Sequence, residues 1–278
     1  MTVLEFTGVV FFGSLAAGFL GALTGLGGGV VIVPLLVLGL GVDLKYAIGA
    51  SLISVIATSS GAAATYVREG YSNIRIGMFL EIATTLGAIG GAILQGVVSG
   101  SAVAVVFGLV LIVSAYLSVR RRTARVEDGK PDKLATWLRL HGTFPSPNGP
   151  QSYEARRVPV GFGLMFLAGL LSGLLGIGSG AVKVLALDQA MALPFKVSTT
   201  TSNFMIGVTA AASAGIYLAR GQIDPGLALP VVLGVLIGSM LGARMLMGAS
   251  VRVLRGVFAV VIVVLGLQMI YQGVTGGL

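Results

Sequence analysis

The chain has 278 residues and a net charge of +8, and its composition is 55% hydrophobic but only 10% charged. A mean hydropathy of +0.98 excludes a soluble globular domain and indicates an integral membrane protein. No cysteine is present, which excludes disulfides and thiolate chemistry.

Long apolar runs recur along the whole chain. A hydrocarbon core of about 30 Å takes about 20 helical residues. Runs of about this length lie near 4–24, 45–67, 76–97, 102–119, 159–175, 196–218, 226–247 and 253–272. The first run carries Glu5 and lacks a basic leader, so we interpret it as mature structure rather than a secretory signal. None of the runs alternates like the strands of a membrane barrel, and the sequence therefore predicts an all-α, multi-pass membrane protein.

One long hydrophilic segment, residues 120–158, is strongly basic. The positive-inside rule places it in the cytoplasm, and because orientation explains its charge, we expect no nucleic-acid partner. Helical spacing over 133–142 predicts a short surface helix that contains His141, and residues 142–150 have the composition of turns. A regulatory role for this helix is the alternative to a plain linker.

Sliding the chain by 151 positions superposes its two halves without a gap. Matched pairs include Gly18 with Gly169, Gly25 with Gly176, Gly29 with Gly180, Ser51 with Ser202, Thr58 with Thr209, Gly87 with Gly238 and Gly91 with Gly242. The repeat predicts two homologous membrane units, 1–119 and 159–278, on either side of the linker 120–158. Such internal duplication is common in secondary transporters.

The basic residues that follow the apolar runs indicate how the halves are oriented. Arg68 and Arg75 follow the second long run, whereas Arg244, Arg252 and Arg255 come one connection later in the second half. Parallel halves would put the second cluster outside, but inverted halves put both clusters in the cytoplasm. We therefore expect two inverted-topology repeats, each a glycine-broken helical hairpin followed by three transmembrane helices, with both termini outside.

Two glycine-rich stretches, GLGGGVVIVP at 25–34 and GIGSGAVKVL at 176–185, interrupt the apolar runs. The piece from Val30 to Leu40 covers only about 16 Å as a helix and cannot span the bilayer. We expect each stretch to be the tip of a re-entrant hairpin, with the two tips meeting near the midplane. Glycine allows positive φ and close approach, and the N-terminus of the returning helix favours an anion. Close helix packing through small residues is the alternative. The candidate anion-binding residues of the tips are Gly27, Gly28, Gly29, Gly178, Ser179 and Gly180.

Lys183 lies in the first turn after Gly180, where its charge opposes the helix dipole, and its counterpart in the first half is Ile32. An intramembrane charge is a functional hypothesis by default, and a bound anion would satisfy both the lysine and the helix end. A structural ion pair with Asp188 is the alternative.

Hydroxyl and amide side chains line the helix that follows each hairpin. Thr199, Ser202, Asn203 and Thr209 share one face in the second half, and Ser51, Ser54 and Thr58 form the matching stripe. These groups could form the wall of an oxyanion site or simply join helices. Glu81, near Thr84 and Thr85, is either a proton-coupling carboxylate or a side chain that reaches the membrane interface.

At these residues the chain resembles the TauE/SafE family of sulfite and sulfonate permeases. The resemblance covers roughly 10–95 and 160–247 and rests on the glycine motifs, on KYAIGASL and on FKVSTTTSNFMIGVTA. Ser179 departs from the triple-glycine pattern. The resemblance implies transport of small organosulfur or inorganic sulfur anions across a prokaryotic inner membrane.

We therefore expect a secondary transporter for an oxyanion such as sulfite, a sulfonate or sulfoacetate, without metal or cofactor. Coupling to protons or sodium and a homo-oligomeric state stay open. A membrane enzyme is the second hypothesis, but the spans hold no Ser-His-Asp set, HExxH motif or carboxylate dyad. A passive channel, or a carrier for another small anion or cation, is the third.

Overall fold

The computed structural model describes residues 2–24, 28–68, 70–119, 132–145, 149–248 and 252–276. The first half contains α1 (Val3–Thr24), α2 (Gly29–Pro34), the π-helix η1 (Leu35–Gly39), α3 (Leu44–Arg68), α4 (Ile74–Gln95) and α5 (Gly100–Val119). The linker contains α6 (Lys133–Trp137), β1 (His141–Phe144) and β2 (Gln151–Glu154). The second half contains α7 (Val158–Leu175), α8 (Gly180–Leu185), the π-helix η2 (Ala186–Ala190), α9 (Phe195–Ala219), α10 (Pro225–Gly248) and α11 (Arg252–Thr275).

The long helices coincide with the apolar runs of the sequence, because each run is the length of a bilayer crossing. Five are long and apolar enough to span a membrane within the described residues: Leu4–Ala22, Ile74–Gln95, Val158–Leu175, Phe195–Ala219 and Pro225–Met245. Many of their outward side chains, such as Leu86 and Leu229, are large, apolar and exposed. The prediction of an all-α membrane protein is confirmed.

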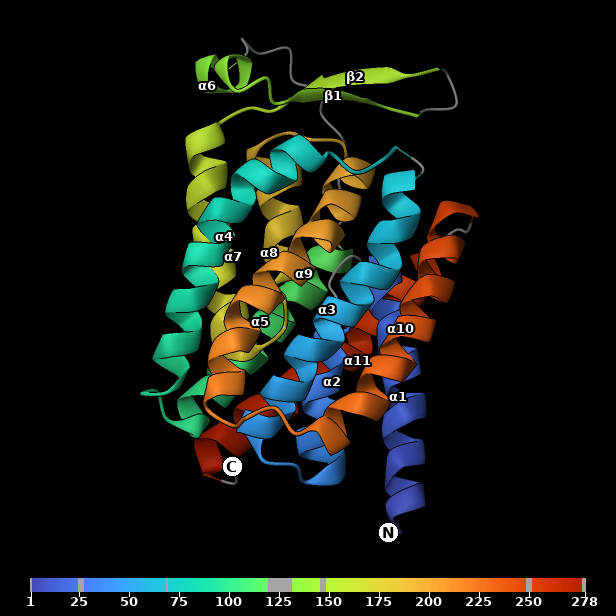
Figure 1. Cartoon of the computed structure of the whole chain (residues 1–278), viewed down its shortest axis with the longest axis vertical. Helices are drawn as coiled ribbons and strands as arrows, with labels where there is room; N and C mark the ends of the chain where they lie inside the picture. Colours follow the sequence, from blue (N-terminus) through green and yellow to red (C-terminus); the bar gives the residue numbers. More distant parts are fainter. Residues whose placement is uncertain are drawn as a thin grey trace.

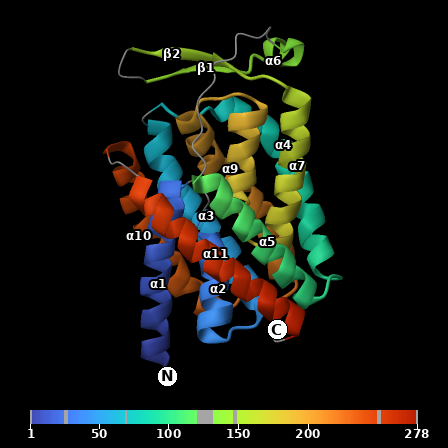
Figure 2. The same cartoon turned by 180° about the vertical axis from the view of Figure 1, so that it is seen from behind.

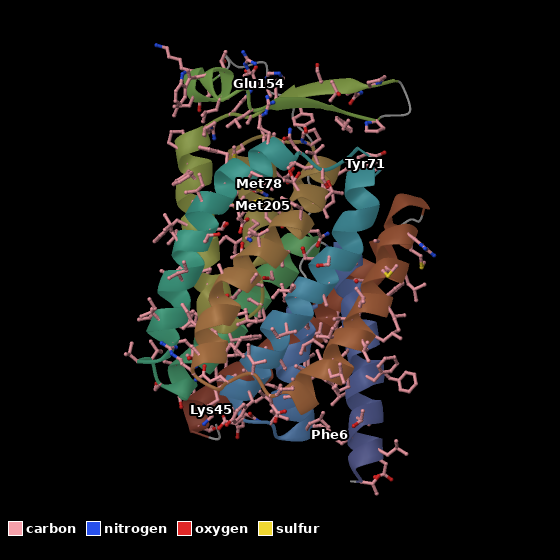
Figure 3. All side chains as sticks on the ribbon, viewed as in Figure 1. Phe6, Lys45, Tyr71, Met78, Glu154 and Met205 are labelled. Atoms are coloured by element: carbon pink, nitrogen blue, oxygen red, sulfur yellow. The ribbon has the colours of Figure 1, made fainter. Side chains whose placement is uncertain are left out.

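Both ends of the described chain lie at one end of the molecule, opposite the linker (Figure 1). Matched helices of the two halves run in opposite directions in this view: α1 and α3 run towards the linker, and α7 and α9 run away from it (Figure 1). Lys45 and Phe6 lie near the terminal end, and Tyr71 and Glu154 lie near the linker end (Figure 3).

Contacts between the halves are reciprocal. α1 packs on α10 while α7 packs on α4, α10 packs on α3 while α4 packs on α9, and α3 also packs on α9. Such exchanged pairs are what a twofold relation between two similar units produces.

Glycines allow the reciprocal helices to approach closely. On α4 and α7 these are Gly87, Gly91, Gly169 and Gly173, which lie against the backbone of the opposite helix, and Gly18, Gly238 and Gly242 play the same part between α1 and α10. A Cβ at any of them would collide with a backbone carbonyl or amide. The repeated glycines outside the hairpin tips are therefore helix-packing residues.

The linker differs from the sequence prediction. The helix expected over 133–142 ends at Trp137, and His141 instead opens strand β1, where it pairs with Glu154. Residues 142–144, expected as a turn, continue this strand. Arg139 has a φ of 52°, a left-handed conformation that ends the helix. Pairing of the two strands then allows Leu140 and Ala155 to be buried.

The linker hairpin lies across one end of the helices in both views (Figures 1 and 2). The Asn73 amide nitrogen donates to the Tyr153 hydroxyl at 2.9 Å and to the His141 carbonyl at 3.3 Å. The backbone amide of Arg156 donates to the Met191 carbonyl at 3.0 Å. Burial raises the pKa of Tyr153, so its phenol stays neutral at physiological pH. The described part of the linker, 132–145 and 149–158, is thus packed onto the membrane unit.

Candidate functional site

Both glycine stretches form hairpins with short returning helices. α2 and η1 return to the terminal end, where α1 begins (Figure 1). In the second hairpin, Gly176, Gly178 and Ser179 have φ values of 68°, 71° and 48°. The left-handed backbone expected from the glycines is therefore present there, and Ser179 adopts it despite its side chain.

The first hairpin differs at its tip. Gly27 lies outside the described residues, and Gly28 has a right-handed φ of −66°, so the backbone at this position does not use the left-handed conformation that glycine allows. Gly28 and Gly29 are required for close approach instead. A Cβ on Gly28 would lie 3.0 Å from the Thr58 hydroxyl, and one on Gly29 would lie 2.6 Å from the Ser51 hydroxyl.

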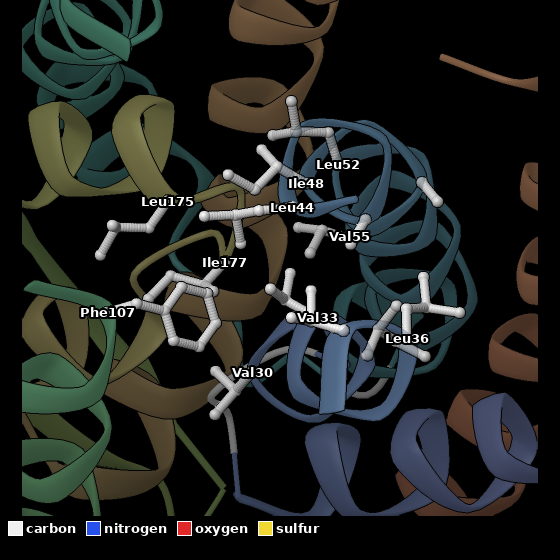
Figure 4. Close-up of a cluster of buried hydrophobic side chains, with 14 of the residues drawn as sticks. Val30, Val33, Leu36, Leu44, Ile48, Leu52, Val55, Phe107, Leu175 and Ile177 are labelled. Carbon is white, nitrogen blue, oxygen red and sulfur yellow. The ribbon is translucent and has the colours of Figure 1, made fainter. Parts of the chain in front are cut away.

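The two hairpin tips meet. The Ser51 hydroxyl donates to the Gly176 carbonyl at 2.6 Å and lies 3.4 Å from the Gly29 carbonyl. Its repeat counterpart, Ser202, donates in the same way to the Gly180 carbonyl at 3.4 Å. Apolar side chains surround the first tip, among them Val30, Val33, Ile48, Val55 and Ile177 (Figure 4). Ser51 therefore fastens the second hairpin to α3, and Ser202 fastens the same hairpin to α9.

Lys183 is fully buried and donates a hydrogen bond to the Thr209 hydroxyl. That hydroxyl lies 2.5 Å from Oε1 of Glu81 and donates to it. Glu81 is only 4% exposed, so its side chain does not reach the interface. Three side chains from α8, α9 and α4 thus form one chain that joins a cation of the second half to a carboxylate of the first. Asp188, the alternative partner from the sequence, lies half-buried in η2.

Four candidate atoms are buried without a hydrogen-bond partner among the described residues: Ser179 Oγ, Thr199 Oγ1, Asn203 Nδ2 and Glu81 Oε2. Ser179 directly precedes α8, and Thr199 and Asn203 lie one turn apart on α9. A buried polar group without a partner costs free energy, and each such group in a native fold needs an explanation. Three of the four are donors: Ser179 lies at the start of the helix that carries Lys183, and Thr199 and Asn203 lie on α9, which packs on that helix.

The matching stripe in the first half is arranged differently. Ser54 donates to the Ser51 carbonyl at 2.7 Å, and Thr58 donates to the Ser54 carbonyl at 2.8 Å. Their hydroxyl protons are thus used within α3. The repeat counterparts of Lys183 and Glu81 are the apolar Ile32 and Val232. The charged part of the site is therefore present once, although the hairpins are duplicated.

Several polar contacts around α9 were not predicted from the sequence. Ser59 of α3 donates to the Asn203 carbonyl at 2.5 Å. The Thr201 hydroxyl accepts from the backbone N–H of Asn73 at 3.0 Å, and the Thr200 hydroxyl donates to the Tyr71 carbonyl at 3.0 Å. The unusual polarity of 198–203 was the available signal, but it did not indicate the partners.

Comparison with known proteins supports a transport role. The model of a family described as sulfite exporter TauE/SafE matches residues 10–269. A probable membrane transporter protein, YunE of Bacillus subtilis, is 28% identical over 268 residues, covering 94% of this chain and 96% of its own length. YdhB of the same organism is 27% identical over 237 residues, with coverages of 85% and 87%. The Methanocaldococcus jannaschii protein MJ0441, also a probable membrane transporter protein, is 25% identical over 268 residues and 91% of each chain. No solved structure matches. The chain belongs to the sulfite exporter TauE/SafE family and is a multi-pass membrane transporter.

Proposed function

We propose that this transporter moves a small sulfur-containing oxyanion, such as sulfite, a sulfonate or sulfoacetate, across the prokaryotic inner membrane by alternating access. The observation that carries the proposal is the fully buried Lys183 on the second hairpin, together with unpartnered buried donors at the tip of that hairpin and on α9.

The donor set fits an oxyanion. A buried ammonium group needs a negative partner, and an oxyanion offers several acceptor oxygens to further donors. Ser179, Thr199 and Asn203 supply such donors as neutral groups. Neutral donors hold the anion weakly enough to release it again. A site built of several cations would retain it. The description of the family as sulfite exporters supports a sulfur anion.

The position of the site between the halves favours alternating access. Glu81 comes from the first half, and Lys183 and Thr209 come from the second. The opposite helix directions and reciprocal contacts support inverted halves with the site between them (Figure 1). Rocking of one half against the other would expose the site first at one face and then at the other.

Ligand-induced thermal stabilisation of the detergent-purified protein tests the proposal. We expect sulfite or a sulfonate to raise the melting temperature, because a ligand that binds only the folded state stabilises it by mass action. Lys183→Gln should abolish this shift, whereas Lys196→Gln, the same change at an exposed lysine of α9, should keep it. A normal shift in Lys183→Gln would place the anion elsewhere.

A further inference from the structure

Glu81 is a buried carboxylate with one oxygen bonded and the other without a partner among the described residues. We propose that Glu81 takes up one proton whenever an anion binds at Lys183, so that proton and anion cross the membrane in the same direction. The inference rests on the proposed function, because it assigns the coupling ion of the same site.

The first step is the charge balance of the empty site. Thr209 carries a single hydroxyl proton. It accepts from Lys183 and donates to Glu81, and its other acceptor, the Met205 carbonyl, lies farther away at 3.0 Å. The hydroxyl therefore connects the ammonium group of Lys183 to the carboxylate of Glu81. With both groups charged, the empty site is neutral.

The second step is the arrival of the anion. A negative ligand at Lys183 neutralises the ammonium charge that had balanced the Glu81 carboxylate. The buried site would then carry a net negative charge. Unbalanced charge in a medium of low dielectric is strongly disfavoured, and buried carboxyl groups respond by taking up a proton. Oε2 of Glu81 is the atom that holds it, because Oε1 is occupied by Thr209. The loaded site is then neutral again.

The third step concerns the other ionisable groups on α4 and on the helices that pack against it. α4 packs on α7 and α9. α7 has no ionisable side chain between Val158 and Leu175, and α4 has only Arg75 besides Glu81. On α9, Lys196 is exposed and lies over the Tyr71 ring, while Tyr217 donates to the Gly173 carbonyl.

The remaining charged neighbour is Asp188, in η2 beyond the end of α8. It is half-buried, unlike Lys183 and Glu81. The repeat counterparts of Lys183 and Glu81 are apolar, Ile32 in the first half and Val232 in the second, so the repeat supplies this lysine–carboxylate pair only once. We therefore expect one proton for each monovalent anion.

Proteoliposomes with a trapped pH dye test the inference. Methanesulfonate is the probe, since its charge is constant over the working pH range and it carries no proton itself. Addition outside should acidify the lumen of wild-type vesicles, and clamping the membrane potential should leave the rate unchanged because the step is electroneutral. The Glu81→Gln variant should acidify the lumen at least about tenfold more slowly than the wild type. It should still exchange internal for external methanesulfonate, since a neutral side chain mimics the protonated carboxyl.

Glu5→Gln, the same change at an exposed carboxylate of α1, is the matched control and should acidify like the wild type. Wild-type uptake of methanesulfonate without acidification would overturn the inference and leave the proposed function intact, as would unchanged acidification by Glu81→Gln. Failure of the wild type to exchange any methanesulfonate would instead contradict the proposed function. The wild-type measurement alone decides the matter if Glu81→Gln does not fold.

Discussion

At the residue scale, the link between Lys183 and Glu81 through Thr209 makes the two charges interdependent. Lys183→Gln should lower the stability of the empty protein by about 3 kcal/mol, because it leaves a buried carboxylate without its cation. The double variant Lys183→Gln/Glu81→Gln should recover much of that loss, because no charge then remains. Melting temperatures of the wild type, the two single variants and the double variant form a double-mutant cycle that measures the coupling between the two groups. Simple addition of the two losses would show that the groups are not coupled.

Asn203 provides a test of the unpartnered donors. Asn203→Ala should weaken anion binding by about ten- to a hundredfold, the loss of a hydrogen bond to a charged group, while the stability of the empty protein changes little. Ser59→Ala is the matched control. It removes the bond to the Asn203 carbonyl and should affect stability more than affinity. Titration of both variants by thermal shift measures the two effects, and equal affinity in Asn203→Ala and the wild type would exclude a binding role for this amide.

At the element scale, the second hairpin depends on the left-handed backbone of its tip. Gly178 has a φ of 71°, and a Cβ there would lie 2.5 Å from Ile206 and 2.9 Å from Val55. Gly221 has a φ of 66°, but a Cβ there meets nothing within 4 Å. Gly221→Ala should therefore cost only backbone strain, about 1 kcal/mol, whereas Gly178→Ala should cost about 2–4 kcal/mol because overpacking is added. Equal melting temperatures for the two variants would contradict the tight tip.

The helices and hairpins could be predicted from the sequence because their signals are local. The length of the apolar runs predicted the long helices. The piece after Gly29 is too short to cross the bilayer, which predicted the first hairpin. The link between Glu81 and Lys183 could not be predicted, because it needs the packing of α4, α8 and α9 together. The strands of the linker were missed for a similar reason. His141 pairs with Glu154, and such pairing is not visible in the helical spacing of 133–142.

At the scale of the whole molecule, both termini should lie outside and the linker inside. The chain has no cysteine, so single cysteines can be placed at Thr2, Gln151 and Thr275 without background. Impermeant maleimide should label the two terminal positions in intact spheroplasts, and it should label Gln151→Cys only after permeabilisation. Labelling of all three positions only after permeabilisation would restore parallel halves.

Exchange of labelled methanesulfonate tests most directly the claim that an oxyanion crosses the membrane at Lys183. Proteoliposomes loaded with the unlabelled anion should take up external label through the wild type and through Lys196→Gln. Lys183→Gln should reduce the exchange about a hundredfold or more, because the anion then enters a buried site without its counter-charge. Exchange at the wild-type rate in Lys183→Gln, or no exchange in the wild type, would contradict the account.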